Sequence, residues 1–132
     1  EATTYNRYMN SKRKGSLAVG EAIRYFTKNN NSVLVPVSDC DKYDLVVDHD
    51  RVLKRIQCKY SDDKEKSGAF IVDLRTFGGY RDKTYHTKYL RGDFDLLFVY
   101  CSNGNSYLIP EERLWGKSQL AIGIKSWNEY KC

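Results

Sequence analysis

The chain has 132 residues, of which 41% are hydrophobic and 30% are charged, a composition typical of a single globular domain. It contains no apolar run that approaches the roughly 20 residues of a membrane span, so we expect no contact with a membrane. The formal net charge of +5 favours a polyanionic partner, because lysine and arginine release condensed counterions when they bind phosphates.

The first expected element is a helix, which follows a polar and basic N-terminal arm over residues 1–14. Apolar side chains recur at helical spacing from Leu17 to Phe26, and Ser16 is in position to cap the helix. The polar run over residues 28–32 ends it. Residues 33–37 are mostly β-branched, and Pro36 places the strand that they predict at a sheet edge.

A β-hairpin follows, with strands over residues 43–48 and 51–60 around a turn at His49-Asp50. The second strand alternates in character, so Gln57 and Lys59 leave one face of the sheet. Ile56 and Cys58 leave the other face, where we expect the core.

Three more strands and a short helix are predicted after the hairpin. Residues 69–74 predict a third strand of the same sheet, residues 95–101 are typical of a strand covered on both faces, and residues 106–109 follow a turn. Pro110 and the two acids after it predict a short helix, whereas residues 117–132 have no firm assignment. This order predicts one domain over residues 15–132, of the α/β or α+β class, with a mixed sheet flanked by helices.

The four cysteines show no paired spacing of the kind that zinc sites use. Cys58 and Cys101 lie in apolar strand-like segments, where cysteine behaves as a small buried hydrophobe. We therefore expect reduced thiols and a cytoplasmic protein.

The side chains best suited to chemistry belong to the predicted hairpin. Asp44 opens its first strand, and Gln57 and Lys59 are two residues apart on its second, so all three can converge on one face. Mg²⁺ prefers oxygen ligands and lowers the pKa of bound water, while a nearby lysine stabilises charge that develops on a phosphate. Glu21, at the border of the apolar helix stripe, is a fourth candidate that could reach the same cation.

Each of these residues also has a simpler interpretation. An aspartate at a strand start often caps a turn, a strand lysine is often a solvated edge charge, and a lone helix glutamate is usually solvated. Asp41 and Asp48 compete with Asp44, although hairpin capping accounts for Asp48. The order and spacing of all four candidates favour a common site.

Three short motifs carry a resemblance to a known family: Gly20-Glu21 on the helix, Tyr43-Asp44 at the hairpin opening and Gln57-Cys58-Lys59 on the return strand. They resemble the core of the PD-(D/E)xK nucleases, which have a restriction-endonuclease-like fold. From Gly15 to about Pro110 the chain is similar to the small endonucleases encoded in bacterial group I introns.

The resemblance implies roles for the candidate residues. Asp44, Gln57 and Glu21 would be metal-binding positions, Lys59 would be the catalytic lysine, and Mg²⁺ would be the cofactor, with Mn²⁺ as an expected substitute. The family usually has Asp or Glu where this chain has Gln57. An amide oxygen brings no negative charge, so the cation would be held more weakly or would depend on Glu21.

Two segments are candidates for holding DNA. Residues 75–91 combine five lysines and arginines with four aromatic side chains, in a long loop that Gly78-Gly79 makes mobile. The simpler alternative is a surface loop with aromatic side chains packed beneath it. The candidate contacts with double-stranded DNA, including the basic arm, are Lys12, Arg13, Lys14, Arg75, Tyr80, Arg81, Lys83, Tyr85, His86, Lys88 and Arg91.

The resemblance implies a site-specific double-stranded DNA endonuclease that acts in intron homing. One such site cuts one strand, so a double-strand break implies a homo-oligomer, at least a dimer, and the long targets of the similar endonucleases imply a tetramer. A Holliday-junction resolvase or a restriction endonuclease would share this chemistry. Gln57 also leaves open a non-catalytic DNA-binding module on a decayed nuclease core.

Overall fold

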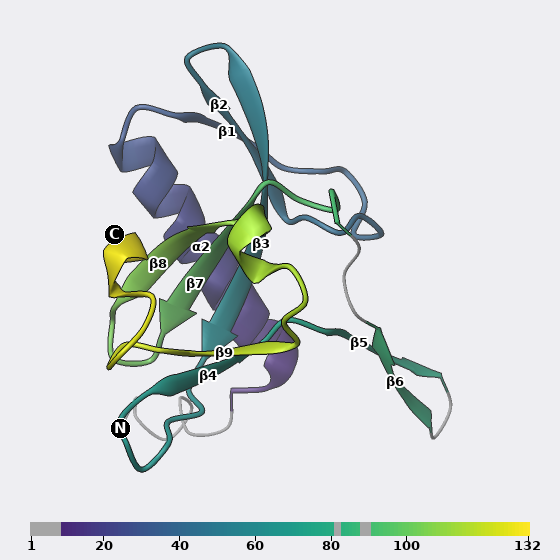
Figure 1. The fold of residues 1–132 in the computed structure, drawn as a ribbon. Helices are drawn as coiled ribbons and strands as arrows, with labels where there is room; N and C mark the ends of the chain where they lie inside the picture. The colour runs from purple at the N-terminus through teal and green to yellow at the C-terminus, as the bar shows by residue number, and fades with distance from the viewer. Residues whose placement is uncertain (1–8, 81–82, 88–90) are drawn as a thin grey trace, which may run out of the picture.

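The computed structural model describes the backbone of residues 9–80, 83–87 and 91–132, and the side chains of these residues except 76–80 and 83–87. Its centre is a five-stranded mixed sheet in the order β1-β2-β3-β7-β8 (Figure 1). The strands are β1 (Ser32–Leu34), β2 (Leu45–His49), β3 (Val52–Ser61), β7 (Leu96–Cys101) and β8 (Ser106–Pro110). Only β3 and β7 are parallel, which confirms the predicted mixed sheet.

Helix α2 (Ser11–Lys28) covers one face of this sheet. Its buried residues Ala18 and Ala22 share a hydrophobic cluster with Ile56 and Cys58 of β3, so the predicted alternation of β3 is confirmed. Because Ile56 and Cys58 point toward the helix, Gln57 and Lys59 leave the opposite face.

The predicted helix start is wrong by about one and a half turns. Asn10, not Ser16, caps α2, because its side-chain oxygen accepts a hydrogen bond of 2.9 Å from the Arg13 backbone N–H. Lys12 and Lys14 therefore lie in the helix and not in an arm. The prediction failed because the apolar stripe begins at Leu17, whereas the first turns of α2 are polar and mostly solvent-facing.

A second, two-stranded sheet covers the other face of the main sheet (Figure 1). It pairs β4 (Phe70–Asp73) with β9 (Gln119–Ile122), and its buried residues Val72 and Ile122 pack against Leu97 and Val99 of β7. The prediction that residues 69–74 join the main sheet is wrong. Their ladder partner lies in the segment that the sequence left unassigned, so the sequence predicted the strand but not its neighbour.

The segment predicted as an irregular loop forms an antiparallel hairpin instead. Strands β5 (Thr76–Tyr80) and β6 (Lys83–Thr87) pair with each other, and the hairpin projects from the body of the protein (Figure 1). Gly78-Gly79 lies inside β5, where it pairs with Tyr85 and Thr84. Glycine and charged residues are depleted in strands, so the composition of this segment predicted a loop.

Short 3-10 helices complete the fold. Helix η1 (Glu111–Leu114) confirms the helix predicted after Pro110, and η2 (Asn128–Tyr130) lies beside β8. Cys58 and Cys101 are buried free thiols, as predicted, and burial raises the pKa of Cys101 to about 11. In the part of the chain that the structure describes, no helix has the length and apolar character needed to cross a membrane.

Candidate active site

Asp44, Gln57 and Lys59 come together on the sheet face that lies opposite α2. Asp44 directly precedes β2, whose first residue Leu45 pairs with Ile56 of β3. The Asp44 backbone N–H donates to the Ile56 carbonyl oxygen at 2.8 Å, which brings Asp44 beside the part of β3 that carries Gln57. The predicted convergence of the carboxylate, the amide and the amine therefore follows from the hairpin.

Two donors fix the Asp44 carboxylate on one of its oxygens. Asp44 Oδ2 accepts from the Cys58 backbone N–H at 2.8 Å and from Gln57 Nε2 at 3.1 Å. Among the described residues, Asp44 Oδ1 and Gln57 Oε1 accept no hydrogen bond. Two neighbouring side chains thus each keep an available oxygen of the kind that hard divalent cations prefer.

Burial and charge act against each other at this point. Burial raises the pKa of the Asp44 carboxyl above its ordinary value, whereas the Cys58 backbone N–H and the Lys59 ammonium lower it. Burial lowers the pKa of Lys59, whereas the carboxylates of Asp73 and Asp44 raise it. The half-buried lysine is therefore positioned within the electrostatic reach of two carboxylates.

Asp73, one of these carboxylates, was not among the predicted site residues. It ends β4, and it accepts hydrogen bonds from the Arg75 backbone N–H at 2.8 Å, Nε at 3.1 Å and Nη2 at 2.9 Å. These bonds with Arg75 lower the pKa of Asp73. One sequence feature could have drawn attention to Asp73: it lies two residues before the oppositely charged Arg75, at the end of a predicted strand. The sequence did not indicate, however, that β4 runs beside Lys59.

Glu21 lies on α2, the helix that covers the sheet face opposite Gln57 and Lys59. It is half-buried, and its side chain makes no hydrogen bond or ion pair with the described residues. Its predicted contact with a cation stays a prediction.

A cation bound at this point would rely on few protein charges. Across the described residues, no three carboxylate, histidine or cysteine side chains form a group that could hold a metal ion. The available set is the Asp44 carboxylate and the Gln57 amide oxygen. This set fits Mg²⁺, which commonly binds to one or two carboxylates and takes its remaining ligands from water and substrate phosphates.

The predicted DNA contacts are spread over several elements. Lys12 and Arg13 are exposed on α2, while Lys14 forms an ion pair of 2.7 Å with Asp62. The Arg91 guanidinium lies over the Trp115 ring, 4.4 Å from its centroid. Arg75 is bound to Asp73, as described above. Outside the described residues lie Arg81 and Lys88, together with the side chains of Tyr80, Lys83, Tyr85 and His86.

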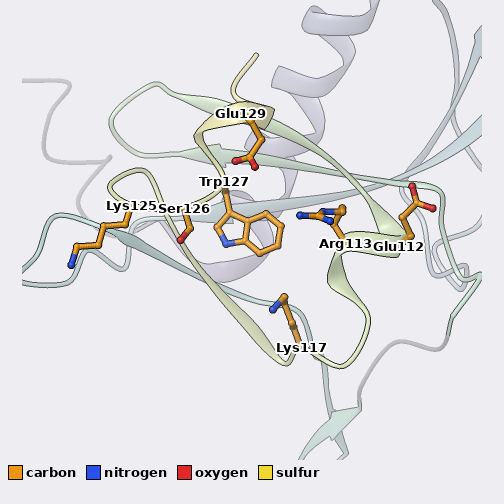
Figure 2. Close-up of a pocket in the computed structure, with 7 residues that line it drawn as sticks. All are labelled: Glu112, Arg113, Lys117, Lys125, Ser126, Trp127 and Glu129. Atoms are coloured by element: carbon orange, nitrogen blue, oxygen red, sulfur yellow. The ribbon is translucent and has the colours of Figure 1, made fainter.

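A hollow of about 590 Å³ contains none of the predicted site residues. Figure 2 shows the Trp127 indole pointing into this hollow, with Lys117 and Arg113 beside it. Its other lining residues include two carboxylates, those of Glu112 and Glu129, which offset part of the positive charge. With Arg113, Lys117 and Lys125, the lining has three cationic side chains against these two carboxylates.

Comparisons with known proteins show a family and a similar fold. A family model described as PD-(D/E)XK endonuclease matches residues 9–126. The solved structure of a bacterial homing endonuclease, I-Ssp6803I, is similar with a TM-score of 0.79 and 27% sequence identity, over 92% of this chain and 88% of that chain. No curated protein sequence matches this chain significantly.

Proposed function

The chain belongs to the PD-(D/E)XK endonuclease family, and from this premise we propose that it cleaves double-stranded DNA site-specifically with a divalent cation. The observation that carries the proposal is the convergence of Asp44, Gln57 and Lys59 on one face of the β2–β3 hairpin, where all three side chains are half-buried. The structural likeness to a homing endonuclease supports intron homing as the biological role, in the cytoplasm.

Each residue has a separate task in this proposal. Asp44 and Gln57 would hold the cation, with Mg²⁺ as the ion and Mn²⁺ as its substitute, and Glu21 would be a further ligand. When bound, the cation lowers the pKa of a water molecule and neutralises phosphate charge. Lys59 places a positive charge where the attacked phosphate becomes more negative. The Cys58 backbone N–H keeps Asp44 in place through the hydrogen bond to Oδ2.

The DNA is held by the positive charge of the chain and by the projecting β5–β6 hairpin. The sequence of that hairpin and its flanks, residues 75–91, carries the predicted basic and aromatic contacts. A double-strand break needs two such sites, so the active form is a homo-oligomer, at least a dimer and, for a long target, a tetramer.

Cleavage of a supercoiled plasmid that carries candidate intron-insertion sites tests this proposal. We expect discrete linear products with Mg²⁺ and none with EDTA. Random nicking would argue against site-specific cleavage, and no cleavage of any duplex would argue against the proposal as a whole. In that second case a four-way junction is the next substrate, because a junction resolvase shares the same chemistry.

Gln57 supports one alternative of a different class, a DNA-binding module whose nuclease core has decayed. An amide in place of the usual acid removes a negative charge from the cation site. Tight DNA binding with no cleavage under Mg²⁺ or Mn²⁺, on duplex and junction alike, would favour this alternative.

A further inference from the structure

The end of β4 lies against the lysine of the candidate site. Lys59 Nζ donates to the Arg75 carbonyl oxygen at 3.4 Å. Two residues further along β3, the Ser61 hydroxyl donates to the Ile71 carbonyl oxygen. Side chains of β3 therefore bind the β4 segment at two points, and the point nearer the site involves Lys59.

The position of the Arg75 carbonyl depends on Asp73. The three hydrogen bonds that Asp73 accepts come from both the backbone and the side chain of Arg75, so they fix the direction of the chain as it leaves β4. The Asp73 carboxylate also acts on the Lys59 ammonium directly as a charge. Asp73 is therefore connected to Lys59 in two ways, through the Arg75 carbonyl and as a nearby charge.

We propose that Asp73 is a positioning residue for Lys59 and acts through Arg75. The inference rests on the proposed nuclease function and deepens it, because it assigns a role to a carboxylate outside the Asp44–Gln57–Lys59 set. The Asp73–Arg75 contact holds the ammonium near the Asp44 carboxylate, where the scissile phosphate must lie. Because Arg75 directly precedes β5, the same contact connects the projecting hairpin to the lysine.

A second pair in the protein provides a matched control. Asp95 accepts hydrogen bonds from the backbone N–H, Nε and Nη2 of Arg55, as Asp73 does from Arg75. The exposed fractions of the side chains are similar, 38% and 35% for Arg55 and Asp95 against 38% and 30% for Arg75 and Asp73. Asp95 is not among the groups that shift the pKa of Lys59. Ion pairs this exposed contribute little to stability. A difference in cleavage rate between variants of Asp73 and of Asp95 therefore reports on the contact with Lys59.

Single-turnover cleavage at saturating protein separates positioning from binding. Since small misplacements of a catalytic group cost large factors in rate, we expect Asp73→Asn to slow cleavage by about tenfold or more, with the DNA dissociation constant changed by less than about threefold. Asp73→Glu, which keeps the charge, should recover part of the rate. Asp95→Asn should cleave at the rate of the unmodified protein. Equal rates for Asp73→Asn and Asp95→Asn, or a loss confined to DNA affinity, would overturn the proposal.

A second measurement does not require cleavage. In protein with isotope-labelled lysines, the side-chain NMR signals of Lys59 are identified by their absence in Lys59→Ala. They should shift in Asp73→Asn and stay in place in Asp95→Asn. If the unmodified protein cleaves no DNA but these shifts occur, the nuclease function fails while the positioning of Lys59 holds. Unshifted Lys59 signals in a folded Asp73→Asn protein would overturn the positioning itself.

Discussion

The Gln57 amide of β3 donates a hydrogen bond of 3.1 Å to the carboxylate of Asp44, the residue that directly precedes β2. A second carboxylate at position 57 would repel the Asp44 carboxylate, whereas the Gln57 amide donates a hydrogen bond to it. The two side chains can therefore lie together without a cation between them. In return, the site has one negative charge fewer than a site with two acids. A divalent ion held here would therefore depend on geometry more than on the charge of the protein ligands.

This relationship predicts the effect of Gln57→Glu. A second carboxylate beside Asp44 should tighten Mg²⁺ or Mn²⁺ binding by about tenfold or more, because a full unit charge is added within a few ångströms of the ion. The cation concentration at half-maximal cleavage, or calorimetry on the free protein, measures this. Gln57→Ala should weaken binding. If neither substitution changes the affinity for the cation, Gln57 is not a ligand.

Glu111 provides a test of stability that is independent of the active site. Its carboxylate is buried and accepts hydrogen bonds from the Gly92 backbone N–H at 2.8 Å and from Trp115 Nε1 at 2.9 Å. Glu111→Ala leaves both donors without this acceptor and should lower the free energy of unfolding by about 2–4 kcal/mol.

Urea unfolding measures this loss, and the exposed neighbour Glu112 is the control. Glu112→Ala should change the free energy of unfolding by less than about 0.5 kcal/mol. Similar losses in the two variants would show that the hydrogen bonds of Glu111 do not stabilise the fold.

We expect the buried thiol of Cys101 to make the protein less stable at alkaline pH. Burial raises the pKa of its thiol to about 11 in the folded protein, whereas an unfolded cysteine titrates near about 8.5. The stabilising effect is therefore fully present below the unfolded pKa and is lost as the pH rises through this interval toward 11. The free energy of unfolding should fall less steeply with pH in Cys101→Ala than in the unmodified protein.

The exposed thiol of Cys40 supplies the control for this pH dependence. Cys40→Ala should retain the slope of the unmodified protein between pH 9 and pH 11, a range that spans the shift of Cys101. If Cys101→Ala retains that slope as well, ionisation of the buried thiol does not contribute to alkaline unfolding.

The parts of the site that could be predicted from sequence are those that a single hairpin determines. Side-chain alternation puts Gln57 and Lys59 on one face, and the two-stranded ladder that begins at Leu45 brings Asp44 close to them. Asp73 could not be found in this way, because its approach to Lys59 depends on how the β4–β9 sheet packs on β3. That packing involves residues distant in sequence and leaves no local pattern.

The same distinction between local and distant contacts applies to the fold. The order of strands and the mixed character of the main sheet could be predicted, since β-branched runs and turns mark them locally. The ladder partner of β4 and the pairing within residues 76–87 could not, because Gln119–Ile122 is short and the β5–β6 hairpin contains glycines and charges. The predicted helix start was wrong because Asn10 caps α2 several residues before the apolar stripe begins, and the prediction relied on that stripe.

Single-turnover cleavage of a DNA target under Mg²⁺ by Asp44→Ala, Lys59→Ala and Asp48→Ala tests the central claim most directly. Asp48 is the control, because it lies in β2, which Asp44 directly precedes, and was a close rival of Asp44 in the sequence. Since single catalytic groups contribute large factors, Asp44→Ala and Lys59→Ala should each slow cleavage by at least about a hundredfold, while Asp48→Ala cleaves normally. Retained cleavage in both Asp44→Ala and Lys59→Ala, or its loss in Asp48→Ala alone, would contradict the assigned active site.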